Sequence, residues 1–328
     1  MGLGLGGGTP KYDVVEIDTV LLRDFVEAGA IRRWPAGDGS AVNFSDWHPA
    51  AKEAVIVGND VFGIPHLLCG FFIMSTQPDI ARARSAKSLI RALHRADTER
   101  QNLAGDMYGS WTTLSLYLDA WADKYGGGRI WQAPFAPPDG SVVNTLRKVS
   151  EECASGASNG CLEDKYDLPD TLAQEFAAGK FDAVMGYSEL LASRYLADRG
   201  SVKRDDLSIG TAPLGEGSSP LLFVDALVMR KGCEGPCVDD AVSFAKYIND
   251  PKTQELLMFG RDSDTGIARY LIPATISAQQ LPSVKADRLY RQIISDIESA
   301  RAFPNGHLDY QRRRWRDDLI AELMKTNP

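Results

Sequence analysis

One cysteine of the sequence stands apart from the other four. Cys69 lies in the apolar stretch 64–74 and has no neighbouring cysteine with which to pair. A thiol becomes a nucleophile when a base or a positive charge lets it lose its proton. The nearby His66 is a weak candidate for this base, because residues three apart on an extended strand face opposite sides. Without a base, Cys69 is more simply a small hydrophobic residue of the core.

Glu189 is the second candidate for chemistry. A strand expected over 181–187 leads into a Gly-Tyr-Ser-Glu turn, and a helix is expected over 190–198. A glutamate at such a turn can face a cleft and act as a general base. The simpler interpretation, which the pattern alone favours, is that Ser188 caps the helix and Glu189 has no chemical role.

Two aspartates occupy positions that are costly for a charge. Asp225 interrupts the apolar strand expected over 221–229, and Asp18 follows the first expected strand, 12–17. A buried carboxylate needs a partner or a ligand, so acids at strand ends are candidates for a binding site. Helix capping or a salt bridge explains these two residues about equally well.

The remaining cysteines form two local pairs. Cys153 and Cys161 flank a polar loop, and Cys233 and Cys237 flank Glu-Gly-Pro. Two short disulfides and one free thiol are typical of a secreted protein, whereas five reduced cysteines are typical of a cytosolic one. We expect the disulfides. We expect no metal site, because Cys233 and Cys237 lack a second Cys or His pair to complete four ligands.

The elements that must position these residues alternate between strands and helices. This order predicts an α/β protein with mostly parallel sheets and helices on both faces. A strand returns late, at 221–229, so we expect the chain to cross between two lobes. Our expected boundaries are a flexible lead over 1–10, lobe 1 over 11–68 and 215–275, and lobe 2 over 69–214 and 276–328. The ligand cleft is expected between the lobes.

Composition excludes several classes of partner. The 328 residues carry a formal net charge of −8, which argues against binding to nucleic acid. No apolar run is long enough to span a membrane. The basic cluster at 312–316 is most simply a solvated helix face.

Five segments together resemble the thiaminase I (thiamine pyridinylase) family, whose members have a type II periplasmic-binding-protein fold. The segments are 12–30, with its strand ending in Asp and its Phe-Val-x-Ala-Gly helix; 62–69, with its Cys motif; 186–189, with Gly-Tyr-Ser-Glu; 220–225, with Pro-Leu-x-x-x-Asp; and 270–274, with Tyr-Leu-x-Pro-Ala. The match runs in order over about residues 11–280, and the Cys and Glu motifs are its most specific part.

The resemblance implies a chemistry for these residues. Glu189 would take the proton of Cys69, and the thiolate would add to the pyrimidine of thiamine so that the thiazole departs. A second nucleophile, an organic base or a thiol, would then displace Cys69. Asp18 and Asp225 would hold the aminopyrimidine, and the positive thiazolium suits an acidic cleft.

Tyrosines are candidates to flank the flat rings of such a substrate. Tyr187 and Tyr270 are the first choices, and Tyr108 and Trp111 are weaker ones; ordinary core packing is the alternative for all of them. The resemblance implies no cofactor. We expect a monomer that acts on small molecules in a secreted or otherwise extracytoplasmic setting, with a cytoplasmic one as the alternative.

The chain departs from the family pattern in three ways. The strand–helix–strand unit that usually precedes the segment at Tyr12 is missing, which suggests a fragment, a variant or an inactive relative. His66 stands where the family pattern has Gln, and the two cysteine pairs are not part of that pattern. The segment 1–10 is Gly-rich and lacks the pattern of a secretory signal.

Three competing functions stay open. A plain solute-binding protein for thiamine or a similar small cation would share the fold, with Cys69 structural. A cysteine hydrolase would need a histidine base, and none of His48, His66, His94 and His307 has motif support. A degenerate fragment with a structural role is the third.

Overall fold

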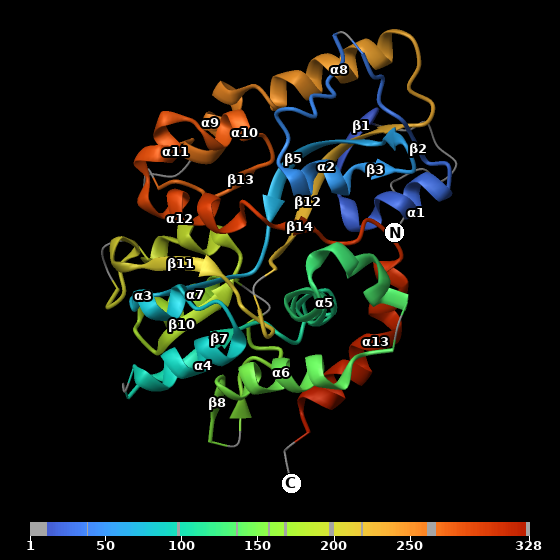
Figure 1. The fold of residues 1–328 in the computed structure, drawn as a ribbon. Coiled ribbons are helices and arrows are strands. Elements are labelled where there is room, and N and C mark those ends of the chain that lie inside the picture. The colour runs from blue at the N-terminus through green and yellow to red at the C-terminus, as the bar shows by residue number, and fades with distance from the viewer. Residues whose placement is uncertain are drawn as a thin grey trace.

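The protein has a mixed α/β fold with two main sheets and helices around them (Figure 1). The computed structural model describes residues 12–37, 39–96, 99–135, 137–156, 158–166, 169–196, 200–217, 219–260 and 267–325. The expected lead, 1–10, lies outside these residues. The described α-helices are α1 (Leu22–Glu27), α2 (Pro49–Ala54), α3 (Pro78–Ala81), α4 (Ala86–Arg95), α5 (Thr112–Tyr125), α6 (Gly140–Glu151), α7 (Pro169–Ala177), α8 (Pro236–Ile248), α9 (Pro251–Phe259), α10 (Ile276–Gln279), α11 (Pro282–Ala286), α12 (Arg288–Ile297) and α13 (Leu308–Leu323).

The first sheet is built around one long strand, β12 (Leu221–Arg230). Its order is β1-β12-β5-β13, with β1 (Val14–Asp18), β5 (Gly63–Cys69) and β13 (Ile272–Pro273); β2 (Ile31–Arg32) and β14 (Arg301–Ala302) also pair with β12. β12 is buried along most of its length, as a near-continuous apolar run predicts for a strand covered on both faces. Apart from Arg230 at its end, Asp225 is the residue of this strand that keeps partial exposure, which marks one face of the sheet as accessible.

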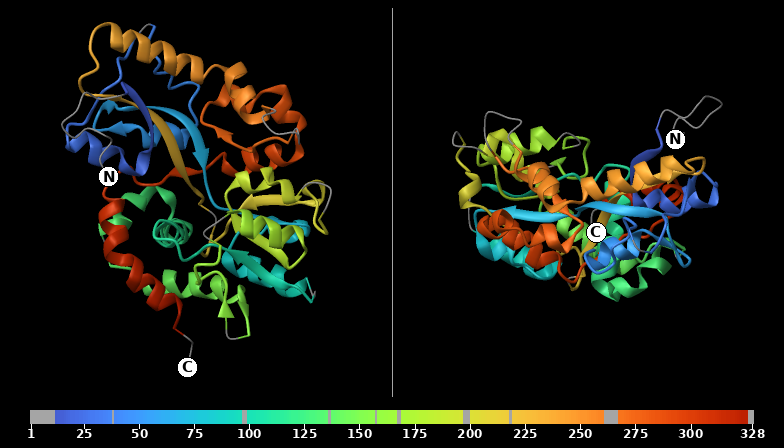
Figure 2. Two further views of the ribbon diagram at one scale, coloured as in Figure 1. Left: turned by 180° about the vertical axis from the view of Figure 1, so that it is seen from behind. Right: turned by 90° about the horizontal axis from the view of Figure 1, so that it is seen from above.

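The second sheet has the order β11-β6-β10-β7. Its strands are β11 (Ser208–Thr211), β6 (Phe72–Ser75), β10 (Phe181–Gly186) and β7 (Gln101–Gly105). Views from behind and from above show the two sheets in separate bodies, with α8 along the outer side of the first (Figure 2). Two small hairpins, β3 (Ile56–Val57) with β4 (Asp60–Val61) and β8 (Ala154–Ser155) with β9 (Ser158–Asn159), complete the described strands.

Most strand pairs are antiparallel, so the expectation of mostly parallel sheets is wrong. Among the described strands, only the β12–β14 and β10–β7 pairs are parallel. β12 is antiparallel to β1, β2 and β5, and β6 is antiparallel to β10 and β11. Helices between strands predicted parallel crossovers, but here successive strands often enter different sheets. Their order in the sequence therefore does not fix their direction.

The chain crosses between the sheets directly after Cys69. β5 ends at this residue and β6 begins at Phe72, so Gly70 and Phe71 alone form the link. A Cβ atom at Gly70 would lie 2.8 Å from the Cδ2 atom of Leu222, so a side chain there would force its neighbours to shift. The close approach holds the end of β5 against β12.

Two buried aspartates of α5 support the return crossing from β11 to β12. The carboxylate of Asp123 accepts a hydrogen bond from the backbone N–H of Gly215 at 2.9 Å, and that of Asp119 accepts one from Leu221 at 3.0 Å. Burial raises the pKa of both carboxyl groups, for Asp123 to about 6. These acids therefore organise the backbone behind the site.

Sheet membership differs from the expected lobes at two points. Cys69, expected to begin lobe 2, ends β5 of the first sheet. β14, in the segment 276–328 expected in lobe 2, pairs with β12 of the first sheet. The same segment also supplies α12, which packs on β11 of the second sheet, and α13, which packs on α5 and α6. The last segment therefore joins both bodies. The other boundaries stay a prediction.

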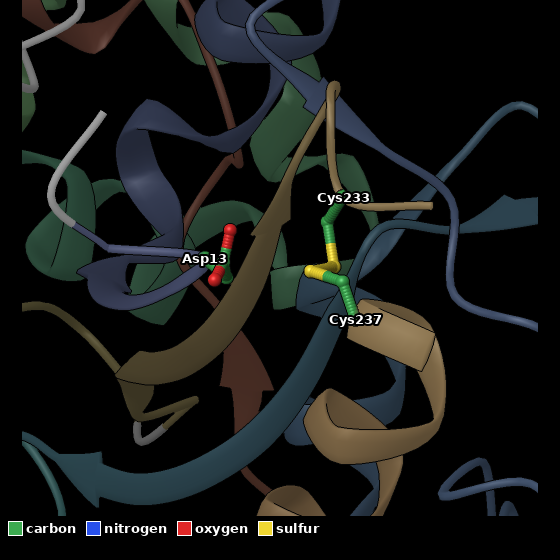
Figure 3. Close-up of side chains that lie close together, drawn as sticks. All are labelled: Asp13, Cys233 and Cys237. Atoms are coloured by element: carbon green, nitrogen blue, oxygen red, sulfur yellow. A yellow bond between two sulfur atoms is a disulfide. The ribbon is translucent and has the colours of Figure 1, made fainter. Parts of the chain in front are cut away.

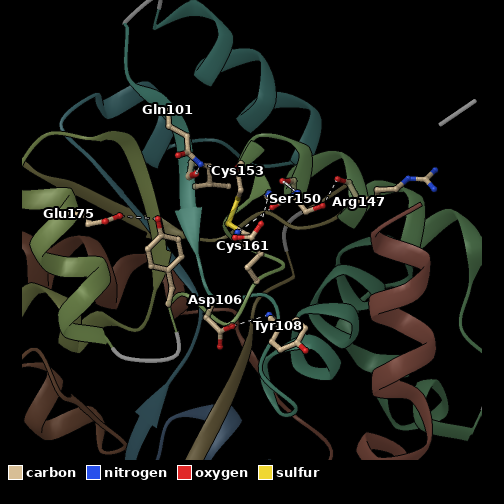
Figure 4. The surroundings of a disulfide bond; sticks show 12 residues. Gln101, Asp106, Tyr108, Arg147, Ser150, Cys153, Cys161 and Glu175 are labelled. Carbon is tan, nitrogen blue, oxygen red and sulfur yellow. Dashed lines mark hydrogen bonds between the residues drawn. A yellow bond between two sulfur atoms is a disulfide. The ribbon is translucent and has the colours of Figure 1, made fainter. Parts of the chain in front are cut away.

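Both cysteine pairs are disulfides in the structure. Cys153–Cys161 lies between α6 and the loop that follows β7, where the Cys161 carbonyl accepts a bond from the N–H of Met107 at 2.9 Å (Figure 4). Cys233–Cys237 closes the turn between β12 and α8, close to Asp13 (Figure 3). Among the described residues, no helix combines the length and apolar character that a membrane crossing requires.

Candidate functional site

Strand register gathers three of the sequence candidates on one face of the first sheet. Cys69 lies opposite Phe223 on β12, and two residues earlier Leu67 lies opposite Asp225. Asp18 at the end of β1 lies opposite Asp225 from the other side. Directly opposed residues share a face, and so do residues two apart on a strand. Cys69, Asp18 and Asp225 therefore point to the same side, and each keeps partial exposure.

A bulge in β5 brings His66 to this face as well. The pairing with β12 shifts by one residue, because Leu67 lies opposite Asp225 but Pro65 lies opposite the next residue, Ala226. His66 is the extra residue, and a bulge re-aims its side chain. Its Nδ1 atom lies 2.5 Å from Oε1 of Glu16, which is two residues from Asp18 on β1. The expectation that His66 and Cys69 face opposite sides is wrong, since it assumed a regular strand.

Glu189 comes from the second sheet. β10 ends at Gly186, and Glu189 lies in the short 3₁₀ turn η3 (Ser188–Ala192) that follows. The Oγ of Ser188 donates a hydrogen bond to the backbone carbonyl of Tyr270 at 2.8 Å and caps no helix. The Gly-Tyr-Ser-Glu turn is thus tied to the segment that leads into β13 of the first sheet.

The two sheets meet at Cys69, because the ring of Tyr187, after β10, lies 6.4 Å from the ring of Phe223, the residue opposite Cys69. Burial raises the pKa of the thiol well above its ordinary value, and the carboxylates of Glu189, Asp225 and Asp18 raise it further. A carboxylate disfavours a nearby thiolate only when the two groups are close. The arrangement therefore surrounds one free thiol with three acids from two lobes.

The carboxyl groups of this cluster also titrate unusually. Burial raises the pKa of Asp18 to about 7. A hydrogen bond from the Val20 N–H lowers this pKa, and the charge of Asp225 raises it. Burial raises the pKa of Asp225 to about 6; Glu16 raises it further and His66 lowers it. The pKa of Glu189 is raised as well, chiefly by burial. Groups with such values can exchange protons near neutral pH.

A pocket of about 520 Å³ opens beside Glu189. Its walls come mainly from the second lobe and are mostly apolar; they include Phe71, Met185, Tyr187 and Leu190. The rings of Tyr187 and Phe71 are stacked, with centroids 5.4 Å apart. The pKa of Tyr187 is raised by burial and by Cys69, Asp18 and Glu189. Tyr187 therefore lies close to both the thiol and the pocket.

Two of the expected substrate-binding tyrosines lie elsewhere. Tyr270 is 3% exposed, packs its ring on Tyr290 and donates its hydroxyl to Asp287 at 3.2 Å. Its backbone is left-handed, with φ at +56°, which is uncommon for a residue with a side chain. The Tyr108 ring is covered by the guanidinium of Arg316 at 4.6 Å. Neither ring lines the pocket beside Glu189.

Trp111, the weaker candidate, is covered in the same way. The guanidinium of Arg312 lies 4.3 Å from the centre of its ring. The basic cluster of α13, expected to be a solvated face, thus has two of its arginines against aromatic rings. A cation over an aromatic face is attracted by the ring quadrupole, which explains why these arginines remain partly buried.

Sequence reasoning missed several residues of the site. Phe71 was hidden in an apolar run, and Asp106 was not considered. Asp106 lines the pocket, but its carboxylate accepts bonds from the N–H groups of Tyr108 and Gly109 and from Thr112. The pattern Asp-x-x-Gly before a helix could have suggested this capping role.

The described residues offer weak prospects for a metal ion. Asp13, Cys233 and Cys237 lie together (Figure 3), but both sulfur atoms belong to the disulfide and are not thiolates. Asp24, Glu27 and His307 also lie close together, at partly to fully exposed positions.

No protein-family model matches the chain, and no curated protein matches it by sequence. Solved structures resemble it closely in fold. Thiaminase I from Bacillus thiaminolyticus has a TM-score of 0.78 and 21% identity, over 98% of this chain and 88% of that one. Clostridium botulinum thiaminase I in complex with thiamin has a TM-score of 0.75 and 20% identity, over 96% of this chain and 87% of that one. The maltose-maltodextrin binding protein of Alicyclobacillus acidocaldarius has a TM-score of 0.64 and 16% identity, over 97% of this chain and 86% of that one.

These likenesses establish the fold. The chain has the mixed α/β architecture of thiaminase I and of type II periplasmic binding proteins, and this part of the expectation is confirmed. One fold therefore carries both enzymes and solute-binding proteins, so function has to be argued from the site.

Proposed function

We propose that the protein is a thiaminase I-like transferase, which replaces the thiazole of thiamine by an organic base or a thiol through a covalent cysteine intermediate. One observation carries this proposal: a free thiol, Cys69, from the first sheet meets a carboxylate, Glu189, from the second. Asp18 and Asp225 flank the thiol on the same sheet face. A plain binding site has no need of a nucleophile and a base at one point.

In the first half-reaction, Glu189 takes the proton of Cys69 and the sulfur adds to C6 of the aminopyrimidine. The bond between the methylene carbon and the thiazolium nitrogen then breaks, and its electron pair leaves with the thiazole. Asp18 and Asp225 stabilise the electron-poor, protonated pyrimidine. Tyr187 packs along the substrate beside the pocket.

Glu189 first releases the proton of Cys69 to the solvent. In the second half-reaction it removes a proton from the incoming base or thiol, and this proton later returns to Cys69. The nucleophile bonds to the methylene carbon, the bond from C6 to sulfur breaks, and Cys69 recovers its proton. Covalent catalysis of this kind divides one difficult displacement into two easier steps. The mostly apolar pocket beside Glu189 offers room for the departing and arriving rings.

The acids around Cys69 have a role in this scheme. They hold the free thiol protonated, which is unfavourable for a nucleophile. A substrate that carries a positive thiazolium brings the opposite charge into the cluster and so favours the thiolate. The nucleophile is thereby activated when its own substrate is bound.

A non-catalytic binding protein for thiamine or a similar cation is the second candidate. The raised pKa of Cys69 and the fold shared with a maltose-maltodextrin binding protein favour it. It would leave the bound ligand intact. In either case we propose an extracytoplasmic location, because two disulfides persist best in an oxidising compartment.

Replacement of Cys69 by Ser tests the proposal. We expect Cys69→Ser to abolish turnover and to leave thiamine binding measurable by calorimetry, because the serine hydroxyl is a much weaker nucleophile in the same place. Full turnover in this variant would remove Cys69 from the mechanism.

Glu189→Gln is the companion variant. It keeps the size and polarity of the side chain but removes the base, so both half-reactions should slow by about 10²–10⁴-fold. Rapid-quench measurement of thiazole release and of adduct formation separates the two steps. If only the affinity for thiamine falls, Glu189 is a ligand contact and not a base.

A further inference from the structure

The bulge of β5 places an ion pair beside the candidate site that the proposed chemistry does not use. His66 is 8% exposed, and its Nδ1 atom lies 2.5 Å from Oε1 of Glu16. A carboxylate only accepts hydrogen bonds, so Nδ1 carries the hydrogen. The state of Nε2 then decides whether the ring is neutral or positively charged. Nε2 is buried and has no hydrogen-bond partner among the described residues.

Asp225 lies beside both members of this pair. It is opposite Leu67, the residue after His66, and its other neighbour, Asp18, is two residues from Glu16. The charges that act on Asp225 have opposite effects on its pKa, because Glu16 raises it and His66 lowers it. Asn249, the further polar residue near the bulge, is neutral and donates to the Pro65 carbonyl at 2.9 Å.

We propose that Glu16 and His66 are positioning residues that set the charge of Asp225 from opposite sides, and that they thereby set the pH range in which the site takes up a cationic substrate. The inference rests on the proposed function for its consequence, since Asp225 holds the pyrimidine in that scheme. The control of Asp225 by its two neighbours does not depend on the proposed function.

The structure explains why two residues are needed. Asp225 stands next to Asp18 in a partly buried cluster, where a second negative charge is disfavoured. His66 lowers the pKa of Asp225 and so offsets this repulsion, and its ring is held on the same sheet face by Glu16. Glu16, whose side chain is 43% exposed, limits the effect and keeps the imidazole in place.

Nuclear magnetic resonance with ¹³C-labelled aspartate tests the proposal directly. The carboxyl carbon of Asp225, assigned by its loss in Asp225→Asn, is titrated in the wild type and in two variants. His66→Gln should move the Asp225 titration to higher pH, and Glu16→Gln should move it to lower pH, each by roughly one unit or less. The acidic limb of kcat/KM for thiamine should move in the same two directions.

His94→Gln serves as the matched control. It removes a second histidine–glutamate pair, His94 with Glu152 at 3.0 Å, from a position outside the cluster. It should leave the Asp225 titration unchanged. Thermal unfolding of each variant shows whether it folds; Glu16→Gln, at an exposed side chain, keeps the test decisive if His66→Gln does not fold.

The outcomes separate this inference from the proposed function. Shifts in the same direction in the two variants would mean that the pair acts only as a structural contact, and no shift in either would mean that it does not act on Asp225; both overturn the inference. If the wild type does not convert thiamine, the proposed function fails, whereas the Asp225 titration still decides whether the pair controls this carboxylate.

Discussion

The acids around Cys69 lower the unfolding free energy of the ligand-free protein when they ionise. Asp18, Asp225 and Glu189 all have raised pKa values, with burial as the largest cause. Each of these groups is harder to ionise in the folded protein than in the unfolded chain. Sites that hold charges in unfavourable surroundings commonly trade stability for function. This trade can be measured at Asp18.

Asp18→Asn should stabilise the protein at high pH and change little at low pH. The pKa of Asp18 is raised to about 7, so between about pH 4 and 7 the folded state binds a proton that the unfolded state has released. Its contribution to stability therefore falls as pH rises through this window and stays low above it. Asn removes the charge, and we expect a gain on the order of 1 kcal/mol at pH 8, measured by denaturant titration, with a loss of thiamine affinity.

Asp250→Asn is a control for the change of capping group. Asp250 also precedes a helix and accepts a bond from a backbone N–H, that of Lys252 at 3.0 Å, but it is exposed. Its replacement should change stability by a similar small amount at every pH. An Asp18→Asn variant that is equally stable relative to wild type at pH 5 and pH 8 would contradict the raised pKa.

At the scale of elements, the turn after β10 is anchored by Ser188, which was expected to cap a helix but bonds to a distant carbonyl instead. Ser188 is fully buried and donates to the Tyr270 carbonyl instead of to a helix end. Tyr270 itself has a left-handed backbone, which is uncommon for a residue with a side chain. The bond therefore joins a strained segment near β13 to the turn that carries Glu189.

Ser188→Ala should loosen this connection. The buried carbonyl of Tyr270 would lose its donor, at a cost of about 1–3 kcal/mol, and Glu189 would be held less firmly. We expect a lower unfolding free energy and a lower kcat for thiamine cleavage. Ser243→Ala is the matched control, because Ser243 also donates to a backbone carbonyl at 2.8 Å but is exposed. An equal effect of the two changes would show that the Ser188 bond has no special role.

The cost of a buried charge and the family resemblance predicted much of the site, and irregular backbone accounts for part of what they missed. Asp18, Cys69 and Asp225 share a face because regular pairing obeys a period of two. His66 was assigned to the wrong face because a one-residue bulge cannot be seen in a hydrophobic pattern. Tyr270 was a candidate through the family resemblance, whereas its side chain is buried against Tyr290.

Neither strand direction nor the shortest strands could be predicted from the sequence. β13 and β14 have two residues each, too few to show alternation. Their partners, β5 and β12, are more than 70 residues away along the chain. Only the folded chain reveals which distant segments meet. The sequence therefore could not predict that the sheets are mainly antiparallel.

At the scale of the whole molecule, the site depends on two bodies joined by short crossings. Cys69 ends a strand of the first sheet, and Glu189 follows a strand of the second. Neither sheet alone supplies both Cys69 and Glu189, the nucleophile and the base of the proposed function. Relative motion of the two bodies would therefore change the distance between Cys69 and Glu189, as expected for a fold that binds ligands between its lobes.

Mass spectrometry of a reaction with thiamine and an aromatic base such as aniline tests the central claim most directly. The proposed function predicts that thiamine is consumed only when the base is present in excess, that the pyrimidine–aniline adduct accumulates, and that a pyrimidine mass is trapped on the Cys69 peptide. Thiamine that survives intact, with no added mass on Cys69, would contradict the claim and identify the protein as a binding protein or an inactive relative.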